Sequence, residues 1–238
     1  MSKHKDFILS PITHILHEVV SANYAIGNGM ETYPLGEHIF QSVFLRMTGS
    51  QEQKMKCICW EMATVDYIYR YDRYTLNKLG ECSNYKEKKE VYKDLIERIK
   101  IYEPGFDVST ALEKRVIRRG TVEELKEIFS NSNLSTWTQN CFLEFVKNHG
   151  DLIKDNHFAA GDELFVNVLQ DRYELLYKHR NRCAHNTLSY QQNLPTLNEL
   201  LDENNRYDNY VMRFALLILI DKIFIELYKK YLLILAEH

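Results

Sequence analysis

The segment that decides the fold lies near the C-terminal end of the sequence: VMRFALLILIDKIFIELYKKYLLILAEH, residues 211–238. It is the part of the chain closest in hydrophobicity to a membrane span, but Arg213, Asp221 and Lys222 interrupt it. A central charged residue is too costly for a lone helix facing lipid, so we expect no membrane association. The segment instead predicts a buried core helix from about Asp208 to Ala236, with apolar residues for the bundle centre: Phe214, Leu217, Ile218, Ile225, Leu227 and Leu232.

The rest of the chain also favours helices. Only 9 Gly and 4 Pro occur in 238 residues, fewer turn-forming residues than a β-sandwich needs. Helical spacing is visible from Gly36 to Met47, after which residues 48–50 interrupt the pattern. Ser50 then predicts the N-cap of a long helix that ends near Tyr74.

An amphipathic, solvated helix is predicted over residues 85–102. Capping patterns predict two more helices, one that begins at Thr121 with Glu124 as a capping box and one capped by Ser135. A long helix is expected from about Asp162 into residues 179–185, and a short one after Pro195. We therefore expect an all-α fold, a single helical domain over residues 1–238. The charged segment at about 86–148 is expected to be an inserted or peripheral helical region.

Composition narrows the class of protein. The formal net charge of -3 excludes a strongly basic nucleic-acid packaging protein but allows a local basic patch. Five scattered cysteines do not suggest a disulfide framework, and the N-terminal residues do not resemble a secretion signal, so a cytoplasmic location is expected. His14 and His17 only weakly resemble a zinc helix, so we predict neither a metal nor a cofactor.

Chemistry-bearing residues are concentrated at positions 177–186, YKHRNRCAHN. An imidazole with a pKa near neutrality moves protons in either direction, and a guanidinium binds phosphate oxygens in a bidentate manner. Together they supply what RNA cleavage by its own 2′-hydroxyl requires, namely a base, an acid and a stabilised phosphorane. Charge and spacing alone also fit a simpler interpretation, a basic helix end that complements the helix dipole.

The order of residues adds to this pattern, because Arg180-Asn181 is followed after three residues by His185. This resembles the R-polar-x3-H motif of the HEPN superfamily, helical-bundle proteins that include many metal-independent endoribonucleases. The resemblance implies that His185 is the general acid or base, that Arg180 stabilises the transition-state phosphate, and that Asn181 orients the imidazole or the phosphate. It also implies a phage-defence or toxin effector, with a regulatory or antitoxin protein as a partner. Three neighbours are candidates for holding the RNA backbone: Lys178, His179 and Arg182.

Helix geometry constrains this site. Five residues of continuous α-helix turn by about 500°, which leaves Arg180 and His185 about 140° apart, whereas Asn181 and His185 share a face. Either the helix ends before His185, or the site is assembled from two chains. HEPN ribonucleases resemble the second case, and we predict a homodimer.

Two other features and two other functions stay open. The tyrosines at positions 67, 69, 71 and 74, together with Arg70 and Arg73, could stack on RNA bases. Structural roles are also possible, because Tyr69 belongs to the apolar stripe of the helix. Asp66 and Arg70 are likewise spaced as an ordinary ion pair on one helix. The carboxylate of Glu61 or Asp66 could form a salt bridge with Arg180 and orient its side chain. The alternative functions are a non-catalytic HEPN bundle that binds RNA or nucleotide or dimerises with a partner, and a purely structural helical protein.

Overall fold

The computed structural model describes residues 3–27, 29–185 and 207–237. Its elements in chain order are α1 (Lys3–Leu9), α2 (His14–Ala22), the 3-10 turn η1 (Met30–Thr32), α3 (Tyr33–Val65), α4 (Tyr67–Tyr71), the π-helical turn η2 (Asp72–Leu76), α5 (Tyr85–Tyr102), α6 (Val108–Ala111), α7 (Lys114–Ser130), α8 (Asn133–Thr138), α9 (Asn140–Leu152), the 3-10 turn η3 (Asp155–His157), β1 (Phe158–Ala160), β2 (Glu163–Phe165), α10 (Val168–His185) and α12 (Tyr210–Glu237). The fold is predominantly helical, as predicted. The short helix predicted after Pro195 lies outside the described residues.

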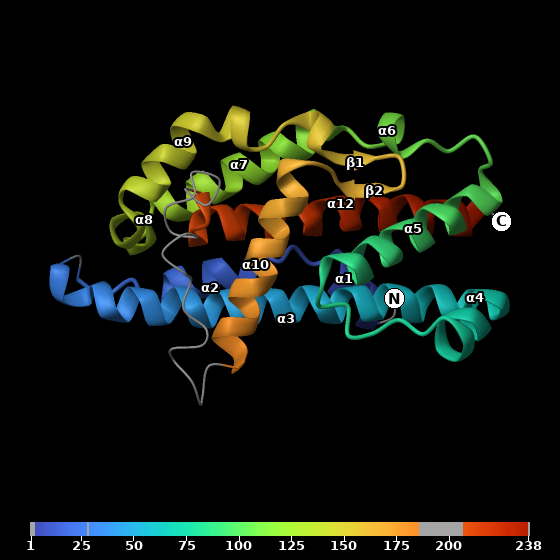
Figure 1. Cartoon of the computed structure of the whole chain (residues 1–238), viewed down its shortest axis with the longest axis horizontal. Helices are drawn as coiled ribbons and strands as arrows, with labels where there is room; N and C mark the ends of the chain where they lie inside the picture. The colour runs from blue at the N-terminus through green and yellow to red at the C-terminus, as the bar shows by residue number, and fades with distance from the viewer. Residues whose placement is uncertain (1–2, 28, 186–206, 238) are drawn as a thin grey trace.

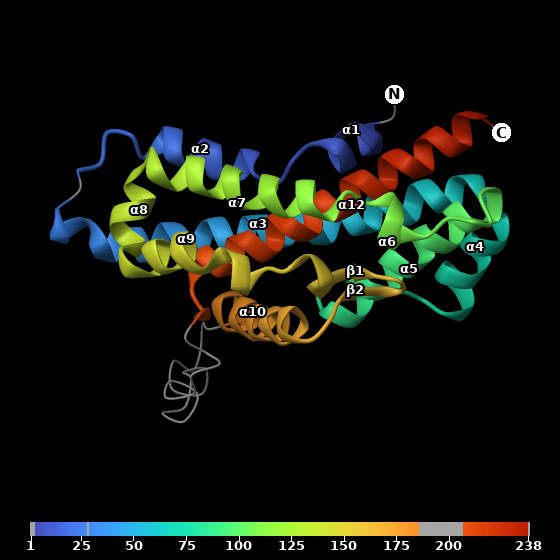
Figure 2. The ribbon, with the colours of Figure 1, turned by 90° about the horizontal axis from the view of Figure 1, so that it is seen from above.

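Helix α12 is the centre of the core. It packs against α1, α3, α5, α7, α9 and α10, and Figures 1 and 2 show it running through the middle of the molecule. Residues 210–221 are all buried, so this stretch is covered on every side. The predicted core helix from Asp208 to Ala236 is therefore confirmed, with bounds that differ by two residues or fewer. No helix in the described parts of the chain has an apolar stretch able to span a membrane.

Helix α3 is one uninterrupted rod of 33 residues. The prediction of a separate helix capped by Ser50 is wrong, because residues 48–50 lie inside α3. The reason is the buried stripe, which continues past them at helical spacing and is fully enclosed at Phe44, Met47, Gln51, Met55, Ile58 and Met62. Gly49 is exposed on the opposite side, where a glycine in a helix is tolerated at a cost of about 1 kcal/mol.

The end of α3 is a sharp break rather than a smooth continuation to Tyr74. Asp66 has extended backbone angles, and its carboxylate accepts a hydrogen bond from the Tyr69 backbone N–H at 2.9 Å, which caps α4. Its other partner is Arg98 on α5, so the predicted pair between Asp66 and Arg70 is wrong. Arg70 instead lies over the ring of Tyr67, 5.0 Å from its centroid.

The segment at 86–148 is part of the core rather than peripheral. Helix α5 has the predicted bounds, and together with α7 it packs along α12. Four of its larger side chains are fully buried: Tyr92, Leu95, Leu125 and Phe129. The expectation of peripheral helices is thus wrong, and the description of α5 as a solvated helix holds only for its outer face.

Two predicted helix starts within this segment are also wrong. Thr121 lies in the middle of α7, fully buried, and its hydroxyl donates to the Ile117 carbonyl at 2.9 Å instead of capping a helix. Ser135 lies inside α8. Gln139, with a φ of 39°, separates α8 from α9, so the predicted single helix is two.

A small hairpin precedes α10, where the sequence predicted helix from Asp162. Strands β1 and β2 are antiparallel, and Gly161 at the turn has a φ of 59°, a conformation that glycine adopts without strain. Tyr85 of α5 donates to the Phe165 carbonyl at 2.7 Å and accepts from the Phe165 N–H at 3.0 Å. Helix α10 therefore begins only at Val168.

A buried ion pair joins α3 to α12. Lys54 Nζ lies 2.6 Å from Asp221 Oδ1, and the two side chains are only 2% and 3% exposed. Asp221 also accepts the Ile12 backbone N–H at 2.8 Å, and Lys54 donates to the Ser10 carbonyl. Burial lowers the pKa of Lys54 and raises that of Asp221. The pair thereby ties the segment between α1 and α2 to the core.

Candidate active site

The predicted motif lies on the last turns of α10, which crosses α3 nearer its middle than its ends (Figure 1). The helix is continuous from Val168 to His185. At about 100° per residue, positions 178, 181, 182 and 185 fall within a sector of about 100°. Three of the predicted site positions, Asn181, Arg182 and His185, therefore share one face with Lys178, whereas Arg180 lies about 150° from the centre of that face and pairs with Glu52 of α3. The His185 side chain is outside the described part of the structure.

Arg180 is held by a carboxylate from α3. Its Nη2 lies 3.2 Å from Glu52 Oε1 and 3.3 Å from Glu52 Oε2, and its Nη1 donates to Asn181 Oδ1 at 3.2 Å. The side chains of Arg180 and Glu52 are 23% and 14% exposed, so the pair is partly shielded from solvent. Such a pair fixes the guanidinium better than an exposed one would, because a long side chain in water keeps its rotamer freedom.

A buried lysine lies within the electrostatic influence of Glu52. Lys88 of α5 is fully buried, and its Nζ donates to the Cys82 carbonyl at 2.7 Å. Burial lowers the pKa of Lys88 to about 8, while the charge of Glu52 opposes that shift and the charge of Arg180 adds to it. Nearby, the fully enclosed Tyr173 of α10 donates to the Ser83 carbonyl at 3.4 Å. Helices α3, α5 and α10 thus meet in a polar cluster of alternating charge around Glu52.

His179 faces the protein interior. Its ring packs against Phe44 and Tyr210, with centroids 5.3 Å and 5.4 Å away, and its Nε2 lies 3.4 Å from Cys183 Sγ. Burial, with Arg213 and Arg182 adding to it, lowers the pKa of His179 to about 3, so the ring is neutral at physiological pH. A neutral, packed ring does not provide the positive charge that would attract a phosphate, so the predicted contact between His179 and the RNA backbone is not supported.

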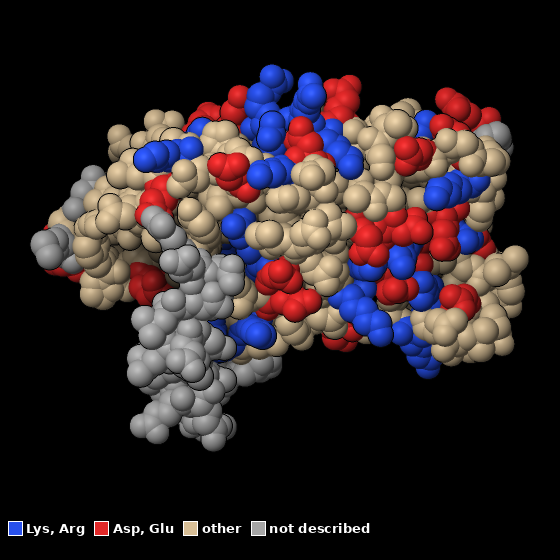
Figure 3. Space-filling model, turned by 45° about the horizontal axis from the view of Figure 1, so that its top comes forward, with Lys and Arg blue, Asp and Glu red and all other residues tan. Residues whose placement is uncertain are grey.

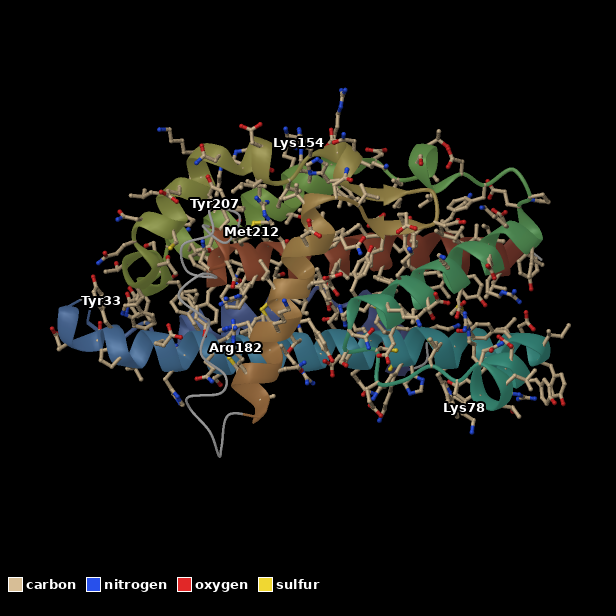
Figure 4. The ribbon with its side chains drawn as sticks, viewed as in Figure 1. Tyr33, Lys78, Lys154, Arg182, Tyr207 and Met212 are labelled. Atoms are coloured by element: carbon tan, nitrogen blue, oxygen red, sulfur yellow. The ribbon has the colours of Figure 1, made fainter. Side chains whose placement is uncertain are left out.

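Lys178 and Arg182 remain suitable for phosphate contacts. Lys178 is exposed and Arg182 is half-buried, and they lie one turn apart on the outer face of α10. Figure 4 shows Arg182 toward the lower end of α10. Other positive side chains gather at the upper edge of Figure 3.

The residues proposed from sequence as partners of Arg180 are engaged elsewhere. Glu61 lies 3.3 Å from His4 Nδ1, and Asp66 pairs with Arg98. Glu52 takes the role instead. The only signal in the sequence is its position on the same helix as Glu61, and helical spacing alone does not distinguish between these carboxylates.

The four tyrosines at positions 67, 69, 71 and 74 differ in burial, so both the core role and the RNA-stacking role predicted from sequence have candidates among them. Tyr69 is buried and donates its hydroxyl to Asp94 at 3.0 Å, which confirms its core role. Tyr67, Tyr71 and Tyr74 are 68%, 49% and 44% exposed. These three rings are available for contacts outside the chain.

The described donors around the motif are Arg180, Asn181, Arg182 and Lys178, which are suited to contacts with phosphate oxygens. Within the described residues no group of three or more His, Cys, Asp or Glu side chains has the arrangement of a metal site. Cys57 and Cys59 are buried free thiols, as expected of packed cysteines. Searches against protein-family models, curated proteins and solved structures found no match to this chain.

Proposed function

We propose that this protein is a HEPN-type, metal-independent RNA endonuclease. The observation that carries the proposal is the Arg180-Asn181-x3-His185 motif at the end of an exposed helix in an all-α fold, with Arg180 oriented by Glu52. An incidental basic helix end would not need a shielded carboxylate that holds one of its arginines.

The reaction follows from these groups. An imidazole of His185 takes the proton of the RNA 2′-hydroxyl, whose oxygen then attacks the adjacent phosphorus. The bond from phosphorus to the 5′-oxygen breaks, and that oxygen receives the proton that the His185 imidazole has taken. Arg180 donates hydrogen bonds to the phosphorane oxygens as negative charge accumulates there. The products are a 2′,3′-cyclic phosphate and a free 5′-hydroxyl.

Two chains complete the site in this proposal. Because α10 continues to His185, Arg180 and His185 are about 140° apart on one helix and do not converge. A two-fold contact at the end of α10 would bring the two motifs together, with Arg180 of one protomer reaching the shared cleft from the side where α10 meets α3, toward His185 of the other. Asn181 and Arg182 would line the shared cleft, and Lys178 would hold the RNA backbone at its edge.

The chemistry is tested by cleavage of a single-stranded RNA in excess EDTA. We expect undiminished cutting and products that end in a 2′,3′-cyclic phosphate or the phosphate opened from it, as identified by mass spectrometry. A strict magnesium requirement would point to another mechanism. Binding of RNA without any cleavage would favour the non-catalytic HEPN alternative.

The two-chain site is tested by the mass of the active species. Multi-angle light scattering of the purified protein is expected to give twice the chain mass of 28.3 kDa at the concentration used for cleavage. A monomer that cleaves RNA at the same rate per chain would overturn the shared site and leave the chemistry intact.

A further inference from the structure

A groove lined by aromatic rings and cations lies where α3, α4 and η2 meet, at the right-hand end of α3 in Figure 1. Its main pocket has a volume of about 410 Å³, and a second pocket of about 210 Å³ adjoins it. Trp60 and Tyr74 line both pockets, with ring centroids 6.4 Å apart and planes nearly perpendicular. We call the two pockets together the Trp60 groove.

The groove has a strongly one-sided charge. Its lining contains four cations, Lys56, Arg70, Arg73 and Lys78, and no carboxylate among the described residues. Lys56 and Arg73 have acidic partners that lie outside the lining. Arg70 stacks on a tyrosine, and Lys78, which projects into solvent below α4 in Figure 4, has no carboxylate partner in the described part of the chain. Two of the four cations, Arg70 and Lys78, are therefore not paired with a carboxylate in the described part of the chain.

The segment from Trp60 to Leu76 borders the groove and exposes many apolar side chains, of which Trp60 and Tyr74 line the groove itself. Seven of the fourteen large hydrophobic side chains exposed in the described residues lie between Trp60 and Leu76. The break at Asp66 and the π-helical turn η2 bring Tyr74 back beside Trp60 at the end of α3. Exposed rings that line a pocket are typical of ligand-binding sites, and π-helical turns are frequent at functional sites.

We propose that the Trp60 groove binds a nucleoside phosphate, with the base stacked on Trp60 or Tyr74 and the phosphate held by Lys78 and Arg70. Aromatic faces flanked by cations are the general solution for binding flat bases linked to phosphates. Four cations in the lining favour a ligand that carries a phosphate over an apolar protein surface. Binding of a free nucleotide in the groove is independent of RNA cleavage, whereas binding of an RNA strand there rests on the proposed function.

The nucleoside phosphate has two candidate sources. Glu52, which holds Arg180, and Trp60 lie on the same helix, about 12 Å apart along its axis. Cys82 connects the two regions, because it lines the groove and its carbonyl accepts the hydrogen bond from Lys88. The ligand is therefore either part of the RNA strand bound at α10 or a free nucleotide. The shared chemistry is a planar base and a phosphate.

Fluorescence of Trp60 distinguishes these sources. The chain has two tryptophans, and Trp137 lies among α3 and α8 residues with its Nε1 donating to Thr32, so Trp137→Phe leaves Trp60 as the only reporter. The probes are AMP and a single-stranded octanucleotide whose 2′-hydroxyls are methylated, which cannot be cut. We expect saturable quenching. Quenching by both probes supports a free-nucleotide site, and quenching by the octanucleotide alone supports a strand-binding site.

Matched variants test the contacts. In anisotropy titrations with the labelled octanucleotide, Trp60→Ala is expected to weaken binding about tenfold or more, the usual contribution of one stacked base. Lys78→Glu should weaken binding and reduce its salt dependence. Tyr24→Ala removes a ring that is 87% exposed outside the groove and should change nothing.

Three results would overturn the proposal. The first is no quenching by either probe, and the second is equal binding by the Trp60→Ala and Tyr24→Ala proteins. The third is a Trp60 emission that changes with protein concentration alone, which would assign the groove to a second copy of the chain. Because the octanucleotide is not cleaved, none of these results bears on the nuclease proposal.

Discussion

Replacement of His185 by alanine is expected to lower the rate of RNA cleavage by about 10²–10⁴, the range that general acid–base catalysis contributes. The fold should be unchanged, because His185 is the last residue of α10 and the packing that orients this helix comes from earlier turns. His38→Ala is the matched control, since His38 is an exposed histidine on α3. Initial rates on one RNA substrate, with circular dichroism and thermal midpoints for both variants, provide the measurement.

A mixture of two inactive variants tests whether the site crosses the dimer. Arg180→Ala and His185→Ala homodimers should each be inactive. If Arg180 of one chain works with His185 of the other, each mixed dimer keeps one intact pair. A refolded equimolar mixture should then regain about a quarter of the wild-type activity. No recovery in a mixture proven to contain mixed dimers would show that each chain uses its own pair.

Undiminished cleavage by His185→Ala would remove the proposed acid–base role altogether. Cleavage lost together with the thermal midpoint would instead assign His185 a structural role. The His38→Ala control separates these outcomes from the general effect of losing one imidazole.

Replacement of Lys54 by methionine is expected to lower the free energy of unfolding by about 3–5 kcal/mol, because it leaves Asp221 charged and buried without its partner. This loss is a large part of the free energy of unfolding of a typical domain, which is about 5–15 kcal/mol. Lys229→Met, which removes an exposed pair with Glu226, should cost about 1 kcal/mol or less. Urea denaturation of the variants measures both changes.

The stability of the Lys54→Met variant should decrease as the pH rises. Burial already raises the pKa of Asp221, and removal of Lys54 raises it further. The folded variant therefore holds a proton that the unfolded chain releases, so its stability falls as the pH rises from about 4 toward the folded pKa. Adding Asp221→Leu should recover part of the stability and remove this pH dependence. A loss below about 1 kcal/mol for Lys54→Met would contradict the assignment of the pair as a structural tie.

Long apolar stripes made most of the fold predictable. Helix α5 has its predicted bounds, and α12 was located because an apolar run interrupted by charges has to be buried in protein. The errors came from local capping signals at Ser50, Thr121 and Ser135. A helix cap involves only a few residues, whereas burial of a continuous apolar stripe involves many and therefore decides whether the helix continues. At Thr121 the hydroxyl donates to a carbonyl of its own helix instead of capping a new one.

The candidate site was predictable only where its residues are close in sequence. Arg180, Asn181 and His185 could be selected by spacing, but Glu52 lies 128 residues from Arg180 and meets it only through the packing of α3 against α10. The inward orientation of His179 likewise depends on Phe44 and Tyr210, which come from two other helices. The hairpin before α10 was missed because Leu164 and Phe165 also fit a helical stripe.

The central position of α12 also has a consequence for synthesis on the ribosome. The helix against which α1, α3, α5 and α7 pack is the last described element to be translated, and the bond from Ile12 to Asp221 spans 209 residues. Until α12 emerges, the apolar faces of the earlier helices have no common partner. The nascent chain must therefore stay collapsed but incomplete through most of its translation, the state in which molecular chaperones bind and aggregation begins.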